Sequence, residues 1–439
     1  MRVLLLCNYD LLNAATVCDH INSFPLYSTH EVVVHSWLVK NGGELGDDFP
    51  LDVFDAVVLH YSLFLSVDAY VAPSTRKRLE SFKGVKAIFL QDEYRFINAS
   101  IKSICDVGFD IIFTCVPENA VEQVYPAAKL PGVERVNVLT GYVPAALLHY
   151  QPVELDKRST DVSYRGRRYP AWHGRLGLEK WTIAERFSAD AKCFDLKCDI
   201  SYLESDRLYG GAWVDLLQRS KAVLGVESGA SVFDFTGEIS GKVDTIEKLL
   251  GDKAKYEKLR QDYFADIEDS ISLAQISPRI FEAIALRTLC ILYEGEYSGV
   301  LKPWRHYVPL KKDHSNMAEV VDVLRDPQKM AEIIANAYAE VALNPEYSYK
   351  AFIEKVDDFL LRRHDISKSK KSVCGFDQPV KGTEATLTTS ALQAQVPFDF
   401  TPNPHILQLR YGSALKLRSV LLPYLPQRFK NLIKALIRH

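Results

Sequence analysis

Residues 277–299 read SPRIFEAIALRTLCILYEGEYSG, a short helix followed by a buried strand and a glycine-rich turn. Ser277 suits the helix N-cap, and Pro278 suits the first helical turn, where no backbone N–H is required. The run LCILY is continuously apolar, which is typical of a strand covered on both faces. The stretch therefore predicts one helix–strand unit of a parallel α/β sheet, with polar residues at the carboxyl end of the strand.

Short apolar runs of the same kind recur along the chain. Six lie at residues 3–7, 31–37, 55–61, 85–91, 109–115 and 134–140, and others at 161–166, 198–201, 221–227, 288–294 and 306–310. They are rich in β-branched and aromatic residues, and helical stretches separate most of them. We therefore predict an α/β fold of two Rossmann-like domains facing a cleft, with a helical C-terminal tail.

The length of 439 residues exceeds what one hydrophobic core usually serves. We predict an N-terminal domain over residues 1–150, a second domain over 151–365, a polar linker over 366–404 and a basic amphipathic tail over 405–439. The tail contains seven Lys and Arg residues and no acidic residue. That pattern predicts contact with an anionic membrane surface, and docking of its leucines onto the protein itself is the alternative.

The composition is that of an ordinary folded protein, with 47% apolar and 25% charged residues. The net charge of −3 gives no reason to expect nucleic-acid binding. The eight cysteines follow no metal-binding spacing, so we expect free thiols and no metal site. The first apolar run is too short for a signal peptide. We expect a cytoplasmic protein that the tail attaches peripherally to the inner face of the cytoplasmic membrane.

The opening stretch supplies the first candidate site residues. Arg279 and Glu282 lie one helical turn apart and share a face. Glu294, Ser298 and Gly299 follow the strand, where a glycine turn lets backbone N–H groups approach a pyrophosphate. Glu282 suits ribose hydroxyls. The alternative is a surface ion pair beside an ordinary turn.

A basic segment opens the second domain. Residues 161–181 read DVSYRGRRYPAWHGRLGLEKW, with Arg165 and Arg167 at the end of a predicted strand and Arg175 and Lys180 further along. Guanidinium groups and a lysine both suit a diphosphate, so either pair is a candidate clamp. A basic surface loop is the alternative.

Two further strand ends carry polar residues. Glu227, Ser228 and Gly229 follow the run at 221–227, and small residues there permit close approach of a base or a sugar, although a plain turn explains them equally well. In the first domain, Asp92 and Glu93 are candidates for a general base that deprotonates an acceptor hydroxyl. His60 is a further catalytic candidate at a strand end.

Two of these segments resemble a known family. FEAIALRTLCILYEGEYSGVL resembles the nucleotide-binding segment of GT-B glycosyltransferases of the family 4 and family 1 type, and GRLGLEK (174–180) resembles their GRLxxEKG signature. The resemblance implies that Glu282 binds ribose and that Arg175 and Lys180 hold the pyrophosphate. The sequence departs from the pattern at Arg287, where glycine is usual, and at Ala274, where the family has a second carboxylate.

The resemblance also implies a function. The expected activity is transfer of a sugar from a nucleotide-diphosphate donor to a glycan or lipid-linked acceptor, in synthesis of surface polysaccharide or O-antigen, without a cofactor or bound metal. Two alternatives share the nucleotide site: a GT-B-fold nucleotide-sugar epimerase, and a non-catalytic nucleotide-sugar-binding partner of a glycan assembly complex.

Overall fold

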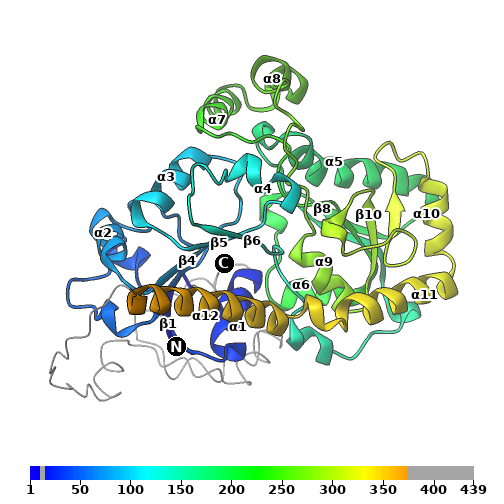
Figure 1. Ribbon diagram of the computed structural model, residues 1–439. Helices are drawn as coiled ribbons and strands as arrows, with labels where there is room; N and C mark the ends of the chain where they lie inside the picture. Colours follow the sequence, from blue (N-terminus) through cyan, green and yellow to red (C-terminus); the bar gives the residue numbers. More distant parts are fainter. Residues whose placement is uncertain (10–14, 374–439) are drawn as a thin grey trace, which may run out of the picture.

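A computed structural model describes residues 1–9 and 15–373, which form two α/β lobes side by side (Figure 1). The first lobe contains a six-stranded parallel sheet in the order β2-β1-β3-β4-β5-β6. Its strands are β1 (Arg2–Leu6), β2 (Glu31–His35), β3 (Ala56–Leu59), β4 (Val85–Phe89), β5 (Ile111–Thr114) and β6 (Glu134–Asn137). Each strand falls within or overlaps one predicted apolar run, because continuous apolar sequence satisfies a sheet buried on both faces.

The second lobe contains a five-stranded parallel sheet in the order β11-β10-β9-β7-β8. Its strands are β7 (Thr160–Arg165), β8 (Cys198–Ser201), β9 (Ser220–Gly225), β10 (Leu289–Tyr293) and β11 (Val308–Leu310). The predicted α/β fold with two Rossmann-like lobes is therefore confirmed.

Helices cover both sheets. Those of the first lobe are α1 (Ala15–Tyr27), α2 (Pro73–Ser81), α3 (Ile97–Val107) and α4 (Glu118–Val124). Those that follow in the second lobe are α5 (Gly174–Ala191), α6 (Gly211–Arg219), α9 (Pro278–Ala285), α10 (Met317–Leu324) and α11 (Pro327–Ala337). Within the described ranges, no helix is long and apolar enough to cross a membrane.

The helix α12 (Tyr349–Val373) returns from the second lobe to the first and lies along it in Figure 1. Phe352 and Val356 of α12 belong to the same buried cluster as Phe89 of β4. The carboxylate of Asp357 accepts hydrogen bonds from the backbone N–H of Thr29 at 2.7 Å and from its hydroxyl at 2.9 Å. By packing, α12 is part of the first lobe, which differs from the predicted boundary of 151–365.

The predicted linker, 366–404, also starts too early, because α12 continues to Val373. The remainder of that linker and the basic tail, 405–439, lie outside the described residues.

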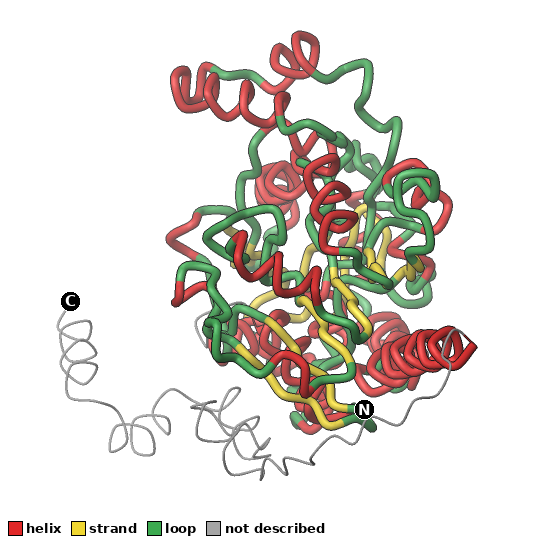
Figure 2. The backbone as a smooth tube through the Cα atoms, turned by 60° about the vertical axis from the view of Figure 1, so that its left-hand side comes forward, coloured by secondary structure: helices red, strands yellow, loops and turns green. Residues whose placement is uncertain are grey.

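An insert between β9 and α9 joins the two lobes. It carries α7 (Glu238–Leu250) and α8 (Tyr256–Tyr263), which project at the top of Figures 1 and 2. Asp234 of the insert donates its N–H to the carbonyl of Tyr94 at 2.7 Å, and its own carbonyl accepts from the N–H of Phe96 at 2.9 Å. Val232 and Phe233 share one buried cluster with residues of α3. The lobes are thus connected by a continuous apolar core on this side.

Candidate functional site

A cleft of about 330 Å³ lies between the lobes. Its walls come from segments that follow strands of both sheets, as the rule for open α/β sheets predicts. Asp92 follows β4, Arg167 follows β7 and Ser228 follows β9. The N-terminal ends of α6 and α9 also border the cleft, at Gly210 and Ser277. Helix N-termini attract anions, so both ends favour a negatively charged ligand.

Three cations of the cleft rest on aromatic rings instead of on carboxylates. Arg167 and Lys180 lie over the ring of Tyr169, at 4.3 Å and 4.6 Å from its centre, and Arg279 lies over Trp213 at 5.2 Å. In the described part of the chain, none of the three forms an ion pair with an acidic side chain. An aromatic face orients a cation without cancelling its charge, so all three charges remain for an anionic ligand.

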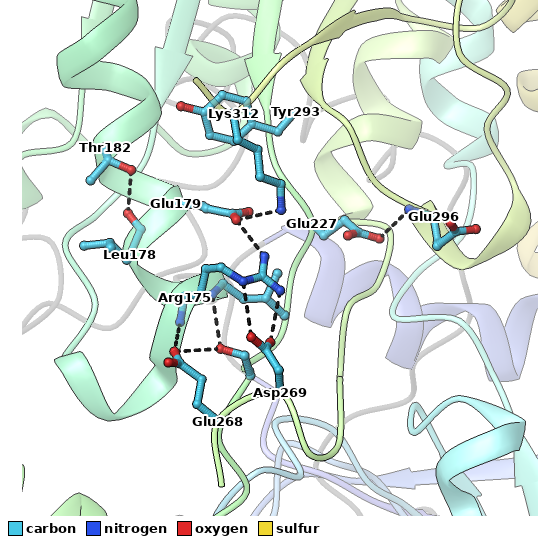
Figure 3. Close-up of polar contacts among 12 residues, drawn as sticks. Arg175, Leu178, Glu179, Thr182, Glu227, Glu268, Asp269, Tyr293, Glu296 and Lys312 are labelled. Atoms are coloured by element: carbon cyan, nitrogen blue, oxygen red, sulfur yellow. Dashed lines mark hydrogen bonds and ion pairs between the residues drawn. The ribbon is translucent and has the colours of Figure 1, made fainter. Parts of the chain in front are cut away.

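The neighbouring arginines are used differently. Arg165 also lines the cleft, but its guanidinium binds the carboxylate of Asp199 at 2.7 Å and three backbone carbonyls of its own lobe. Arg175 does not line the cleft, because it is bound to Glu179 at 2.8 Å and to Asp269 at 3.0 Å (Figure 3). Neither of the two predicted clamps, Arg165 with Arg167 or Arg175 with Lys180, therefore presents both of its charges to the cleft. The structure instead brings Arg167 and Lys180, one member of each pair, onto the same tyrosine.

The carboxyl group of Glu282 lines the cleft beneath Arg279. It is buried, and its Oε2 accepts a hydrogen bond from Nε1 of Trp213 at 2.6 Å. Burial raises the pKa of Glu282 to about 7. Arg279 donates to the carbonyl of Arg165 at 2.6 Å and forms no ion pair with Glu282, which excludes the surface ion pair considered above. A buried carboxyl with a raised pKa, in an anion-binding cleft, suits hydroxyl groups, which both donate and accept hydrogen bonds.

The glycine turn after β10 does not line the cleft, contrary to expectation. The N–H groups of Glu296 and Tyr297 donate to the buried carboxylate of Glu227, at 3.1 Å and 2.8 Å. Figure 3 shows the first of these bonds. Backbone groups that we expected to bind pyrophosphate are therefore occupied by the chain itself. Glu294, Ser298 and Gly299 are absent from the cleft wall, and Ser298 instead accepts a hydrogen bond from the N–H of Ile276 at 3.2 Å.

The residues of the segment after β9 point to different places. Ser228 and Gly229 line the cleft, whereas Glu227 points to the turn after β10. Gly229 has φ +109, and a Cβ there would lie 1.6 Å from the carbonyl oxygen of Leu273. Only glycine fits this position, because the wall strands approach each other so closely. The backbone of Ser228 pairs with Gln275 in both directions, at 2.7 Å and 3.0 Å.

The two adjacent acids of the first lobe have different environments. Asp92 lines the cleft in the left-handed conformation, with φ +58. Glu93 is buried away from it and accepts hydrogen bonds from Thr114 Oγ1 at 2.6 Å, Tyr125 Oη at 2.6 Å and the N–H of Cys115 at 2.7 Å. Burial raises the pKa of Glu93 to about 7. The structure thus places Asp92 at the cleft and Glu93 within the fold.

His60 is not available as a catalytic group. Its side chain is fully buried, with Nε2 2.9 Å from Nδ1 of His20 and Nδ1 2.9 Å from Oγ of Ser62. Burial and the neighbouring His20 hold the pKa of His60 well below its usual value, so the ring stays neutral. It is a hydrogen-bonded core histidine and does not contribute to the cleft wall.

Sequence reasoning missed the aromatic part of the site. Tyr169 and Trp213 line the cleft together with Tyr94 and Tyr209. The signal for Tyr169 was present, since it directly follows two arginines in the quoted basic segment. Trp213 had no local signal, because only the packing of α6 against α9 places it beside Glu282. Among the described residues, no group of three His, Cys, Asp or Glu side chains is arranged to hold a metal ion.

No protein-family model matches the sequence, and a comparison with curated proteins finds no relative. Solved structures of similar shape include an α-glucosyltransferase in complex with UDP, with TM-score 0.47 and 10% identity, covering 84% of this chain and 100% of that one. T4 phage BGT in complex with its UDP-glucose substrate has TM-score 0.41 and 12% identity, covering 86% and 100%. Anabaena HepE in complex with UDP-glucose has TM-score 0.43 and 10% identity, covering 83% and 100%.

Proposed function

We propose that this protein is a glycosyltransferase that uses a nucleotide-diphosphate sugar as donor. The observation that carries the proposal is the set of three cleft cations that form no ion pair with an acidic side chain among the described residues, Arg167, Lys180 and Arg279. A donor diphosphate carries charge of the opposite sign and fits between them. The same groups stabilise the diphosphate as it leaves the sugar, because they already point to where negative charge develops.

The rest of the donor fits the adjacent wall. Glu282 lies one helical turn beyond Arg279 and accepts hydrogen bonds from the ribose hydroxyls. Ser228, Gly229 and Gln275 form the wall next to it, and the proposed position of the nucleotide base is against this wall. Binding in this orientation places the reacting carbon of the sugar toward the first lobe.

Asp92 is the proposed general base. It belongs to the first lobe, opposite the proposed donor site, and lines the same cleft. Among the described residues of the first lobe, it is the acidic residue that lines this cleft. An acceptor hydroxyl placed between Asp92 and the sugar transfers its proton to the carboxylate as the new glycosidic bond forms. The acceptor is proposed to be a glycan or a lipid-linked glycan, in synthesis of a surface polysaccharide or O-antigen.

A thermal-shift screen tests the donor. UDP-, GDP-, ADP-, dTDP- and CMP-sugars are added to the wild type and to Arg167→Met, which removes a cleft cation and keeps an extended side chain. A ligand at 100 times its Kd adds about 2.7 kcal/mol to the free energy of unfolding. We expect one nucleotide class to stabilise the wild type and to lose most of that effect in Arg167→Met. No stabilisation by any of the five contradicts the proposal.

Transfer is tested with the donor found in that screen. Asp92→Asn keeps the shape of the side chain and removes the base, so we expect donor binding to persist while release of the nucleoside diphosphate in the presence of acceptor falls by 10²-fold or more. Equal turnover in both proteins assigns the base elsewhere. Binding without turnover in either protein supports the non-catalytic alternative.

Membrane attachment through residues 405–439 is a separate proposal based on their sequence. Full-length protein and a version ending at residue 367 are compared by co-sedimentation with vesicles that contain anionic lipid. Pelleting of the full-length protein alone supports attachment, and equal pelleting contradicts it.

A further inference from the structure

We propose that Tyr169 is a positioning residue of the diphosphate subsite: its ring holds Arg167 and Lys180 together toward the cleft and leaves both charges available. The role assigned to this subsite rests on the proposed function. Tyr169 itself acts through the two cations, not on the reacting atoms.

Two pairs of cations in the second lobe are held in opposite ways. Arg175 and Lys312 both bind the buried carboxylate of Glu179, at 2.8 Å and 2.7 Å, outside the cleft wall (Figure 3). Arg167 and Lys180 share the ring of Tyr169, inside the cleft. Glu179 and Lys180 are adjacent on α5, so one helix contributes to both pairs.

The two kinds of support leave different amounts of positive charge available for a ligand. A carboxylate brings two cations together by cancelling part of their charge, which suits a structural contact. An aromatic ring attracts cations through its quadrupole and carries no net charge. Because like charges repel, two uncompensated cations need such a support to remain close before a ligand arrives. Tyr169 provides this support where an anion has to bind.

The electrostatics of Tyr169 agree with this arrangement. Burial disfavours the phenolate, but Lys180 and Arg167 outweigh burial, Arg167 also by hydrogen bonding to the hydroxyl, and the pKa of Tyr169 lies below its usual value. Both cations therefore act strongly on this side chain.

The ring of Tyr169 is itself fixed by a ring of its own lobe, which in turn contacts the first lobe. It contacts the ring of His173 edge-on, with 4.8 Å between the centres, and His173 stacks on Trp172 at 3.9 Å. Tyr94 of the first lobe lies 5.1 Å from His173. Burial, with Lys180, Arg167 and Arg95 adding to it, lowers the pKa of His173 to about 3, so this imidazole stays neutral. Tyr94 is two residues from Asp92 in the sequence. A chain of aromatic contacts therefore runs from Tyr169, which holds the cation pair, to the segment that carries the proposed base.

The test uses inorganic pyrophosphate and UDP as probes, measured by isothermal titration calorimetry. Tyr169→Met fills similar space without a ring, and Tyr169→Phe restores the ring without the hydroxyl. We expect Tyr169→Met to bind pyrophosphate roughly tenfold more weakly than wild type. Tyr169→Phe keeps the ring but loses the hydroxyl that Arg167 hydrogen-bonds, so we expect it to recover part of the loss. Tyr338→Met is the matched control, since Tyr338 supports Arg287 at 4.1 Å and does not line the cleft.

The outcomes separate this inference from the proposed function. Unchanged pyrophosphate affinity in Tyr169→Met overturns the inference, as does equal weakening in Tyr169→Phe. Pyrophosphate binding that depends on the ring supports the inference even if no nucleotide sugar binds, which would contradict only the proposed function. If Tyr169→Met does not fold, the same titrations are made on Tyr169→Phe and Tyr169→Trp. Both variants keep a ring, so both are expected to lose less than tenfold in pyrophosphate affinity. A tenfold loss of affinity in Tyr169→Phe overturns the inference.

Discussion

Trp213 donates its indole N–H to Oε2 of Glu282 at 2.6 Å, and both side chains line the cleft. Trp213 comes from α6 and Glu282 from α9, two helices that share a buried cluster. The same indole ring also lies under the guanidinium of Arg279, at 5.2 Å. One tryptophan therefore orients both the carboxyl group and one of the cations that the proposed donor contacts.

Removing the indole donor is expected to destabilise the protein more at high pH. Trp213→Phe leaves the buried carboxyl of Glu282 without this hydrogen bond, which costs about 1–3 kcal/mol when the carboxyl is ionised. Urea unfolding at pH 8 and at pH 5.5 measures the effect, and we expect the larger loss at pH 8. Trp304→Phe is the control, because Trp304 is exposed and its ring lies under Lys329 at 5.5 Å. A cost for Trp213→Phe that is independent of pH would contradict an ionised Glu282.

Glu282 is also expected to make the stability of the wild type fall as pH rises. Its pKa is about 7 in the folded protein, against 4.5 as the ordinary value, so the folded state holds the proton more tightly than the unfolded state. The free energy of unfolding then decreases between pH 4.5 and 7, by up to about 3 kcal/mol from this group. Glu282→Gln removes the titration while keeping an acceptor for Trp213. Parallel stability curves for the two proteins would show that Glu282 does not titrate in this range.

The two acids after β4 are expected to respond differently to substitution. Glu93 receives three hydrogen bonds in the core, so Glu93→Ala leaves buried donors unsatisfied and costs about 3 kcal/mol or more. Asp92→Asn changes a side chain at the cleft and is expected to alter stability by less than about 0.5 kcal/mol. Chemical denaturation of both variants checks the contrast. Similar losses would mean that Asp92, too, has a structural role.

The fold was largely predictable because parallel sheets leave a local signature. Every strand of both sheets lies within or overlaps one of the short runs identified in the sequence, and such runs require no knowledge of distant contacts. The carboxyl-edge rule likewise directed attention to Asp92, Arg167 and Ser228, which line the cleft.

The errors arose where a side chain's direction depends on its partners. Glu227 follows a strand as Ser228 does, but it turns to two backbone N–H groups that no local pattern reveals. Arg175 matched a family signature, yet Glu179 and Asp269 bind it outside the cleft. Arg287, at the position where the resembled pattern has glycine, adopts the left-handed conformation at φ +55, which glycine adopts most readily.

The contact between the insert and the first lobe leads to a prediction from two glycines. Gly237 precedes α7 with φ +85, and a Cβ there would lie 1.8 Å from the ring of Phe96, whereas Gly241, on the same helix, has nothing within 4 Å. Gly237→Ala has to displace Phe96 or the insert, and we expect a loss of about 2 kcal/mol or more. Gly241→Ala is expected to stabilise by roughly 0.5–1 kcal/mol, because alanine favours the helix. Urea unfolding measures both. Equal effects of the two substitutions would mean that the insert is not held tightly against the first lobe, since only a close contact at Phe96 distinguishes the two sites.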